Sequence, residues 1–539
     1  MKTHPQFRIS IFAICFFAFS FNAMGNDTIH VKWKGNGWDM LFKIVATAGE
    51  QFIVNWGDST SVFTYTDSIG FHYIKQANID TIIGTGDWQD IYRQDMSMID
   101  YYAIISGATT NCRFLKFNCS RTNIYALEVS NCPVLEELDC SYNQLCSLNL
   151  SNYLNLKVLN CKATQIAHLD IKNCTNLTYL DCSSNQLTNL DLQTNTIIDS
   201  LDCSYNQLTR IDLRLNTILR HLELAANQLT TLDLHTNKAL QTLICSFNQL
   251  TDLDLHTNTA LQTLICFNNQ LTDLDLFTNT ALQSLACSNN QLTALDLRNN
   301  TVLKSVWCHF NQLTLLDLSG STELQELDCY NNHLTNLKIN EHALLESIWA
   351  QNNRLQLSDL YELSKRLNNS HGSYFGEQTL EVQEVAIGEP VNFSKQKEFD
   401  GIATHFVIIK IEPDNLQLNY TIADGIITFN NTGTYRVIMT NSVIMSYTYR
   451  DPAVVIAEIN VVETQNFKIY PNPTTGLLKI KNEDSKTENF QFFDILGKKQ
   501  QVPYNKQQMN GIIEINISHL PAGIYFIQIN GKTGKVVKN

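Results

Sequence analysis

"LDCSYNQL" occupies residues 138–145 and recurs, letter for letter, at residues 201–208. The two copies lie 63 residues apart, three steps of 21 residues, and a cysteine recurs on the same step. Internal similarity at a period of about 20 to 29 residues is typical of a solenoid, in which each repeat packs on its neighbours. The repeated column consists of Cys119, Cys140, Cys161, Cys182, Cys203, Leu224, Cys245, Cys266, Cys287, Cys308, Cys329 and Ala350.

Each repeat predicts one short strand. An apolar residue stands two positions before every member of the column, and Leu or Ile stands five positions after it. The alternation L-x-C turns both side chains inward, and strands of successive repeats stack in parallel about 4.8 Å apart. Twelve repeats run from Phe114 to Arg366. We therefore expect a mainly β fold, a curved solenoid about 55 Å long whose strands line one face.

The pattern L-x-x-L-x-C-x-x-N-x-L resembles the leucine-rich repeat. The stretch LTDLDLHTNTALQTLICFNNQ at residues 250–270 shows its second half, L-x-x-L-D-L-x-x-N. This is similar to a bacterial subclass with 21-residue repeats, in which each repeat nests two similar halves. The resemblance covers residues 114–366 and implies an exported binding protein of the adhesin or internalin type.

The cysteine column is interpreted as packing. Neighbouring positions have parallel Cα–Cβ vectors about 4.8 Å apart, whereas a disulfide needs Cβ atoms about 3.8 Å apart that face each other. Because Leu224 and Ala350 fill the same column, the position requires only a small or medium apolar group. A single file of thiols offers no tetrahedral metal cluster. Outside the column stand Cys112, Cys132, Cys146 and Cys174, and a Cys112–Cys132 disulfide is an open alternative in an exported protein.

Two polar columns follow the same period. The first is expected to turn an amide into each bend, where it satisfies backbone groups; it consists of Asn143, Asn185, Asn206, Asn227, Asn248, Asn269, Asn290, Asn311, Asn332 and Asn353. The second is expected to face outward and bond to local backbone; it consists of Asp170, Asp191, Asp212, Asp233, Asp254, Asp275, Asp296 and Asp317. His235 and His256 share a column that Phe277 and Arg298 continue. The sequence thus predicts neither a metal site nor a cofactor.

The N-terminus and the charge indicate export. Residues 1–25 combine Lys2 and Arg8, an apolar run and a small-residue end, as in a secretory signal peptide. No other stretch is apolar for the roughly 18 residues that a transmembrane segment needs. The chain has a net charge of −14, which argues against a nucleic-acid partner because polyphosphates bind to basic surfaces. Residues 467–539 alone hold ten Lys and five acidic residues, so a domain boundary is expected near residue 466.

Flanking segments are expected to be β modules. Residues 26–86 alternate short apolar runs with turns, and their VNWGDST at 54–60 and FHYI at 71–74 resemble the W-G-D…H-x-Y pattern of PKD-like domains. Residues 87–113 are expected to cap the solenoid. The stretch 357–369 has helical spacing and should close its other end. Residues 367–463 are predicted to contain this helical end and then, from 377, an immunoglobulin-like sandwich.

The C-terminal region 467–539 resembles the type A sorting domain of the type IX secretion system. Three motifs carry the resemblance, FKIYPNPTTGLLKI, FQFFDILGKK and ISHLPAGIYFIQINGKTGKVVKN. It implies a small β-sandwich that directs export across the outer membrane of a Gram-negative bacterium through the type IX machinery. The matching residues are Tyr470, Pro471, Asn472, Pro473, Gly476, Asp494, Gly497, Lys498, Leu520, Pro521, Gly523, Tyr525, Lys535 and Lys538.

Positions flanking the column cysteine predict where a ligand binds, because they alternate with the inward Leu and Cys and so face the concave side. The strip before the cysteine changes from acidic to apolar near Ile244. Contiguous apolar patches mark interaction sites, and the predicted patch consists of Ile244, Phe247, Ile265, Phe267, Trp307, His309, Phe310, Tyr330 and Trp349. No catalytic motif is found. We therefore expect a secreted or cell-surface, non-enzymatic protein that binds a protein or a glycan; the alternatives are a secreted enzyme and a spacer that displays a flanking module.

Overall fold

The computed structural model describes residues 27–34, 40–46, 51–55, 75–76, 79–83, 89–93, 100–107, 113–129, 132–151, 153–412, 418–445, 451–462, 467–470, 474–482, 490–495, 498–507, 512–529 and 532–539. The chain divides into two compact units. The first contains residues 1–353, 365–374 and 447–449, and the second contains residues 354–364, 375–446 and 450–539. The segment 1–25, expected to be a signal peptide, lies outside the described residues.

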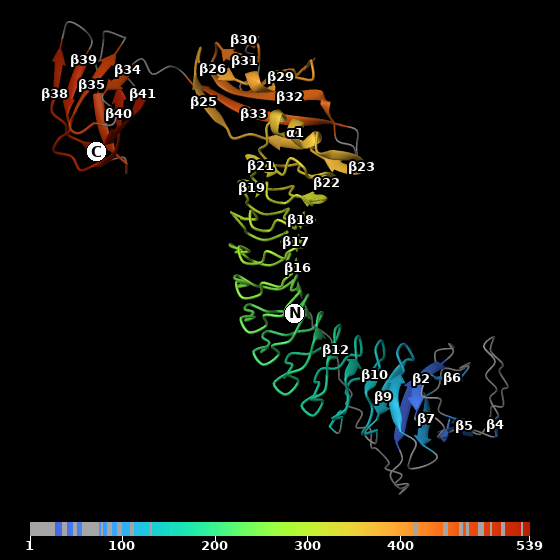
Figure 1. The fold of residues 1–539 in the computed structure, drawn as a ribbon. Helices are drawn as coiled ribbons and strands as arrows, with labels where there is room; N and C mark the ends of the chain where they lie inside the picture. Colours follow the sequence, from blue (N-terminus) through green and yellow to red (C-terminus); the bar gives the residue numbers. More distant parts are fainter. Residues whose placement is uncertain are drawn as a thin grey trace, which may run out of the picture. The chain divides into compact units, whose positions relative to one another are not determined.

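The first unit is built on a solenoid of stacked parallel strands, as predicted. Successive repeat strands pair in register at a step of 21 residues, for example Leu243 with Leu264. The strands lie on the inner side of the curve and turns form the outer side (Figure 1). Within the described ranges the stack comprises β8 (Phe114–Asn118), β10 (Glu137–Asp139), β11 (Val158–Asn160), β12 (Tyr179–Asp181), β13 (Ser200–Asp202), β14 (His221–Glu223), β15 (Thr242–Ile244), β16 (Thr263–Ile265), β17 (Ser284–Ala286), β18 (Ser305–Trp307), β20 (Glu326–Asp328) and β22 (Leu345–Trp349).

Asparagine side-chain amides connect each rung to the next by hydrogen bonds. The Asn269 carbonyl oxygen accepts the N–H of Leu250 at 3.0 Å, and its amide nitrogen donates to the Cys245 and Cys266 carbonyls at 3.0 and 3.1 Å. The same contacts recur along the predicted Asn column, which confirms its structural role. A second buried column was not assigned a role from the sequence. It consists of Asn195, Asn216, Asn237, Asn258, Asn279 and Asn300, whose amide nitrogens donate to backbone carbonyls of the preceding rungs.

All ten column cysteines are free and buried, as the rung geometry predicts. Burial raises the pKa of each of these thiols. Cys132 is also a buried free thiol, and its Sγ lies 3.5 Å from the Thr28 carbonyl oxygen. The alternative of a Cys112–Cys132 disulfide is therefore not supported, and Cys112 itself lies outside the described residues. Cys146 is exposed.

Strands from the N-terminal segment continue the solenoid sheet. β2 (Met40–Ala46) pairs antiparallel with β8, and β6 (Gln89–Arg93) pairs with β2. A second sheet has the order β4-β5-β3-β7-β1-β9 and contains β1 (Thr28–Lys34), β3 (Gln51–Asn55), β4 (Lys75–Gln76), β5 (Ile79–Ile83), β7 (Asp100–Gly107) and β9 (Ile124–Glu128). The strands that pair directly with the first repeat thus come from 28–46, whereas 87–113 supplies β6 and β7. The W-G-D and FHYI motifs lie outside the described residues.

At the other end, a strand completes the stack. β23 (Leu367–Tyr374) pairs in parallel with β22, with Trp349 opposite Tyr374. The prediction of a helix over 357–369 is wrong in its second half, because α1 (Leu357–Ser364) ends before this strand begins. Pairing with the open edge of β22 satisfies backbone groups that a continued helix would leave exposed. Leu357, Leu360 and Leu363 of α1 are buried, and α1 packs on β32 (Gly433–Met445) and β33 (Pro452–Val462) in the second unit.

The second unit holds two β modules. Residues 377–462 form one sheet of β24 (Glu377–Thr379), β25 (Gln383–Ala386), β29 (His405–Glu412), β32 and β33, another of β26 (Pro390–Asn392), β30 (Tyr420–Ala423) and β31 (Ile426–Phe429), and a short pair, β27 (Glu398–Phe399) and β28 (Ile402–Ala403). The Tyr435 hydroxyl donates to the Asn431 carbonyl at 3.0 Å, as in the tyrosine corner of immunoglobulin-like sandwiches.

The C-terminal module is the small β-sandwich that its motifs imply. One sheet has the order β34-β35-β39-β38 and the other β37-β36-β40-β41. Apolar side chains from both sheets, among them Ile480, Phe492 and Ile527, form one buried core. The strands are β34 (Phe467–Tyr470), β35 (Leu477–Asn482), β36 (Phe490–Asp494), β37 (Lys499–Gln500), β38 (Tyr504–Gln507), β39 (Ile512–Asn516), β40 (Gly523–Ile529) and β41 (Lys532–Lys538).

Cysteine accessibility tests the packing of the solenoid. We expect an alkylating reagent to modify exposed Cys146 in the native protein and to leave the ten column cysteines unmodified, because they are buried and their raised pKa values suppress the reactive thiolate. In denaturant all should be modified. Mass spectrometry of the digested protein measures both outcomes. Disulfide-linked peptides between adjacent column cysteines would contradict the rung geometry.

Candidate ligand-binding face and sorting domain

The strip that faces the concave side forms one continuous row. Strand pairing places Glu223 next to Ile244, then Ile265, Ala286, Trp307, Asp328, Trp349 and Tyr374. Its change from acidic to apolar therefore occurs between neighbouring strands. Trp307 is 43% exposed, whereas Ile244, Ile265 and Trp349 are half-buried. The sequence prediction missed Tyr374, whose ring centroid lies 5.9 Å from that of Trp349, because the repeat pattern ends before it.

The remaining members of the predicted patch form two aromatic groups beside this row. Phe247 and Phe267 meet edge to face at 5.2 Å. The His309 ring stacks on Tyr330 at 4.5 Å, and Phe310 contacts both rings. Asn289 and small side chains such as Ser288 separate the groups along the rungs. The structure thus brings the nine predicted residues to one face, in two clusters joined by the central row.

Four of the exposed aromatic side chains share a backbone feature. The residue two positions after the column residue has positive φ in every rung, from 52° to 59°. Asn tolerates this left-handed conformation and occupies it in four rungs, whereas a bulky residue there is strained. Phe247 and Phe310 nevertheless adopt it and are about half exposed, at 49% and 46%. Tyr142 and Tyr205 do the same in the N-terminal half. Backbone stability does not explain these aromatic residues.

The N-terminal half of the concave face is acidic. The Lys162 Nζ atom lies 3.8 Å from Asp181 and 4.0 Å from Asp202. Burial raises the pKa of Asp181, and burial together with the charge of Asp202 raises the pKa of Glu223. Asp181 is already bound locally, since it accepts the Ser183 N–H at 3.0 Å and the Ser183 hydroxyl at 2.6 Å.

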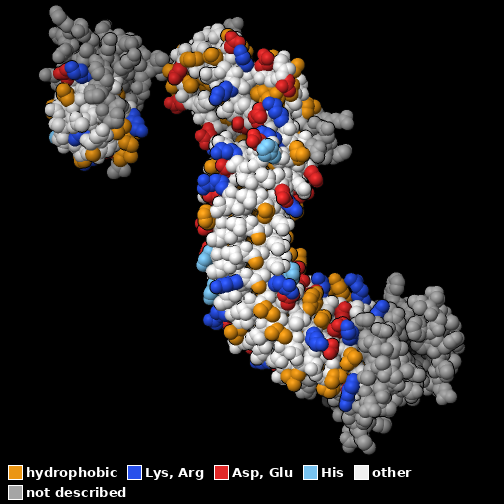
Figure 2. Space-filling model, viewed as in Figure 1, with side chains coloured by type: hydrophobic (Ala, Val, Ile, Leu, Met, Phe, Trp, Pro, Cys, Tyr) orange, Lys and Arg blue, Asp and Glu red, His pale blue; other side chains and the backbone are white. Residues whose placement is uncertain are grey.

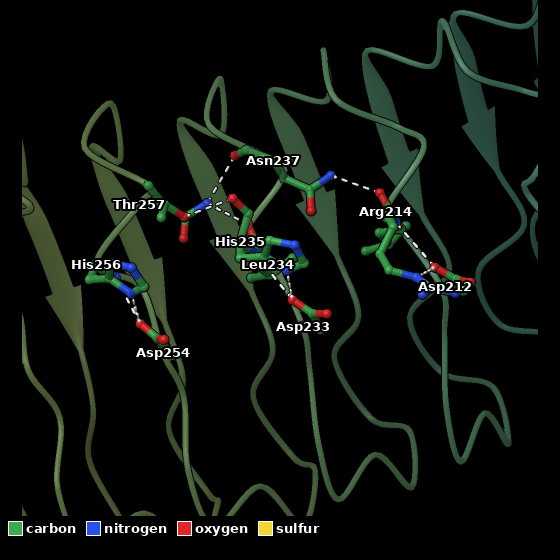
Figure 3. Close-up of polar contacts among 11 residues, drawn as sticks. Asp212, Arg214, Asp233, Leu234, His235, Asn237, Asp254, His256 and Thr257 are labelled. Atoms are coloured by element: carbon green, nitrogen blue, oxygen red, sulfur yellow. Dashed lines mark hydrogen bonds and ion pairs between the residues drawn. The ribbon is translucent and has the colours of Figure 1, made fainter.

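The predicted Asp column faces outward and binds local backbone. Each carboxylate accepts the N–H two residues on, for example His235 N–H to Asp233 at 3.2 Å and His256 N–H to Asp254 at 3.0 Å. Figure 3 shows that the His235 and His256 rings each contact the aspartate of their own rung, as Arg214 does. The neighbouring imidazole lowers the pKa of Asp233 and of Asp254.

These paired side chains are solvated surface contacts. Basic and histidine side chains gather along one edge of the solenoid in Figure 2. No group of three or more His, Cys, Asp or Glu residues suited to hold a metal ion occurs in the part of the chain that the structure describes. The local backbone hydrogen bonds of the outward column agree with the structural interpretation.

The sorting motifs converge on one segment of the C-terminal sandwich. A Cβ atom on Gly476 would lie 2.9 Å from the Ser518 Cβ atom, so glycine is required for this approach. The Lys538 Nζ atom donates to the Ser518 carbonyl at 2.9 Å and also to the Leu520 carbonyl. The Tyr525 hydroxyl donates to the Pro521 carbonyl at 2.9 Å. Gly476 of the first motif and Lys538, near the end of the third motif, thus both contact the segment 518–521.

The other sorting residues are placed as follows. Asp494 of β36 accepts the Lys498 N–H at 2.9 Å and so closes a turn in the second motif. Tyr470 ends β34, Gly523 begins β40 and Lys535 lies in β41. Pro471, Asn472, Pro473 and Gly497 lie outside the described residues.

Comparisons with known proteins identify both the repeats and the C-terminal domain. A family model described as "Secretion system C-terminal sorting domain" matches residues 468–539, and one described as "Leucine Rich repeats (2 copies)" matches residues 259–299. The chain therefore contains leucine-rich repeats and a secretion sorting domain. No match was found among curated proteins.

Several solved structures are similar to this chain. The functional domain of InlJ from Listeria monocytogenes, which includes a cysteine ladder, is 24% identical with a TM-score of 0.36, covering 64% of this chain and 90% of that one. YopM, a leucine-rich effector protein from Yersinia pestis, is 25% identical with a TM-score of 0.38, covering 45% and 72%. InlP from Listeria monocytogenes is 18% identical with a TM-score of 0.34, covering 53% and 81%.

Replacing Phe247 with Asn tests whether this aromatic side chain serves stability. Asn relieves a backbone strain of about 1 kcal/mol, which should offset the lost contact with Phe267. We expect the free energy of unfolding, measured by urea denaturation, to change by less than about 1 kcal/mol. Phe277→Asn is the matched control, because Phe277 is also exposed but is not among the residues with positive φ. A markedly larger loss for Phe247→Asn than for the control would assign Phe247 a structural role.

Proposed function

We propose that this chain is an exported, non-enzymatic binding protein that holds a macromolecular ligand, a protein or a glycan, on the apolar half of the concave face. The observation that carries the proposal is the exposed aromatic surface around Trp307, Phe247 and Phe310. Exposed aromatic side chains that gather on one face are typical of interaction sites. The strained backbone at Phe247 and Phe310 supports selection for contact rather than for folding.

Export rests on the sorting domain. Because residues 468–539 match a secretion sorting domain, the protein is secreted or attached to the cell surface. Passage through the type IX machinery and an N-terminal signal peptide over residues 1–25 belong to the proposal. No helix among the described residues is long and apolar enough to cross a membrane.

Two other functions make different predictions. An enzyme would need converging reactive groups, whereas the carboxylates of the outward column bond to local backbone along the rungs. A spacer would bind nothing through the solenoid, so substitutions on its concave face would leave every interaction of the full chain unchanged. Binding measured on concave-face variants therefore separates a spacer from a binding protein.

The ligand-binding prediction compares the two halves of the concave face. The immobilised mature chain is screened against extracellular proteins and soluble polysaccharides, and each binder is titrated with single variants. Trp307→Ala and Trp349→Ala should each weaken binding by at least about 1 kcal/mol, because large aromatic side chains dominate interfaces. Asp181→Ala and Asp202→Ala should matter less. Circular dichroism checks folding of all four. A larger effect of the two aspartates would place the site in the acidic half.

The export prediction concerns the C-terminal domain. A chain that ends at Val462 lacks the sorting domain and keeps strands β1 to β33. In a Gram-negative host with type IX secretion, we expect it to accumulate in the periplasm while the full chain reaches the surface or the medium. Fractionation followed by immunoblotting measures the distribution. Recovery of the truncated chain outside the cell would contradict a sorting role.

A further inference from the structure

The apolar half of the concave face contains an isolated acidic centre. Asp328 lies between Trp307 and Trp349 on the neighbouring strands, directly opposite both in the pairing register. Glu326 lies two residues earlier on the same strand, β20, and therefore faces the same side. It stands between Ser305 and Ser347. The Asp328 carboxylate thus stands between two Trp residues, and Glu326 lies beside it on the same face.

Among the described residues, no Lys or Arg side chain pairs with either carboxylate, and the one basic contact is His309. The Asp328 Oδ2 atom lies 3.1 Å from the His309 Nδ1 atom, but its Oδ1 atom has no hydrogen-bond partner. For Glu326, no ion pair or side-chain hydrogen bond occurs among the described residues. The concave positions of the rungs from His221 to Gln351 contain no Lys or Arg. The Asp328 side chain keeps 23% of its surface exposed, so its charge is accessible.

The unpartnered group at this centre is an acceptor, the Asp328 Oδ1 atom. An acceptor without a donor costs free energy, which a bound donor recovers. A guanidinium group supplies five donors and no acceptor, binds a carboxylate through two parallel hydrogen bonds and stacks on indole rings.

We infer that this centre, framed by Trp307, Asp328, Glu326 and Trp349, binds an arginine side chain of a basic polypeptide partner. This inference rests on the proposed function, because it assumes that the concave face is the binding surface. The acidic residues of the N-terminal half carry the same charge at the other end of the row, so a partner rich in Arg matches both acidic stretches. A neutral glycan would stack on the Trp rings but leave the two carboxylates without a counter-charge.

The test uses the full mature chain and three probes, labelled nona-arginine, labelled nona-lysine and a neutral soluble glucan, at about 150 mM salt. We expect nona-arginine to bind more tightly than nona-lysine, because only guanidinium binds carboxylate in the bidentate mode. The double variant Asp328→Asn with Glu326→Gln, which preserves side-chain shape, should weaken nona-arginine binding by at least about fivefold. Trp307→Ala should weaken it as well. Fluorescence anisotropy measures each affinity, and urea denaturation confirms folding.

Asp275→Asn is the matched control, since it removes a carboxylate charge from the outward column while Asn can still accept the Phe277 N–H. It should leave nona-arginine binding unchanged. An equal loss in the control, absence of nona-arginine binding, or equal affinity for nona-lysine would overturn the inference. Glucan binding that needs Trp307 but not Asp328 would also overturn it and leave the proposed function intact. If the Trp substitutions weaken the binding of no probe and of no screened binder, both the inference and the proposed function are overturned.

Discussion

The structure depends on how each rung satisfies the backbone groups of its bend. A turn every few residues leaves carbonyl and N–H groups pointing into an apolar interior, where an unpaired group is costly. Buried asparagine amides resolve this. Asn269 accepts from Leu250 and donates to the carbonyls of Cys245 and Cys266, and so joins two rungs in three hydrogen bonds. Because the bonds connect residue i with residues 19 and 24 earlier, the repeat length cannot drift without losing them.

Once the inner positions are fixed, the residues between them are free to carry function. The L-x-C strand holds Leu and Cys inside, where burial raises the thiol pKa and favours packing over chemistry. The outward residue of the same strand makes no contribution to this core, so it can change from Asp202 to Ile265 to Trp307 without disturbing the rung. The position of positive φ, two residues after the column residue, adds a second set of variable residues outside the core. Phe247 and Phe310 occupy it at a backbone cost.

The same logic separates the solenoid from the C-terminal sandwich. In the solenoid, contacts repeat and the variable positions are distributed along a row. In the sorting domain, distant motifs converge: Gly476 permits the approach of Ser518, and the terminal Lys538 donates to two carbonyls of that segment. These residues therefore support one local structure. Their spacing in the sequence reflects strand lengths rather than a repeat.

The sequence by itself determined the solenoid, its 21-residue rungs, the free thiols, the inward Asn column and the concave row, because each rung has identical neighbours and a period therefore specifies the environment of every residue. It also determined the sorting domain. Tertiary structure alone decided what happens where the repeat ends. Residues 367–369 became part of the strand 367–374 rather than of the helix because β22 offered an open edge, and β2 paired with the first rung for the same reason. Tertiary structure also decided the positive φ of Phe247, which depends on the course of a turn. It likewise left the Asp328 Oδ1 atom without a partner, which depends on side chains from adjacent rungs.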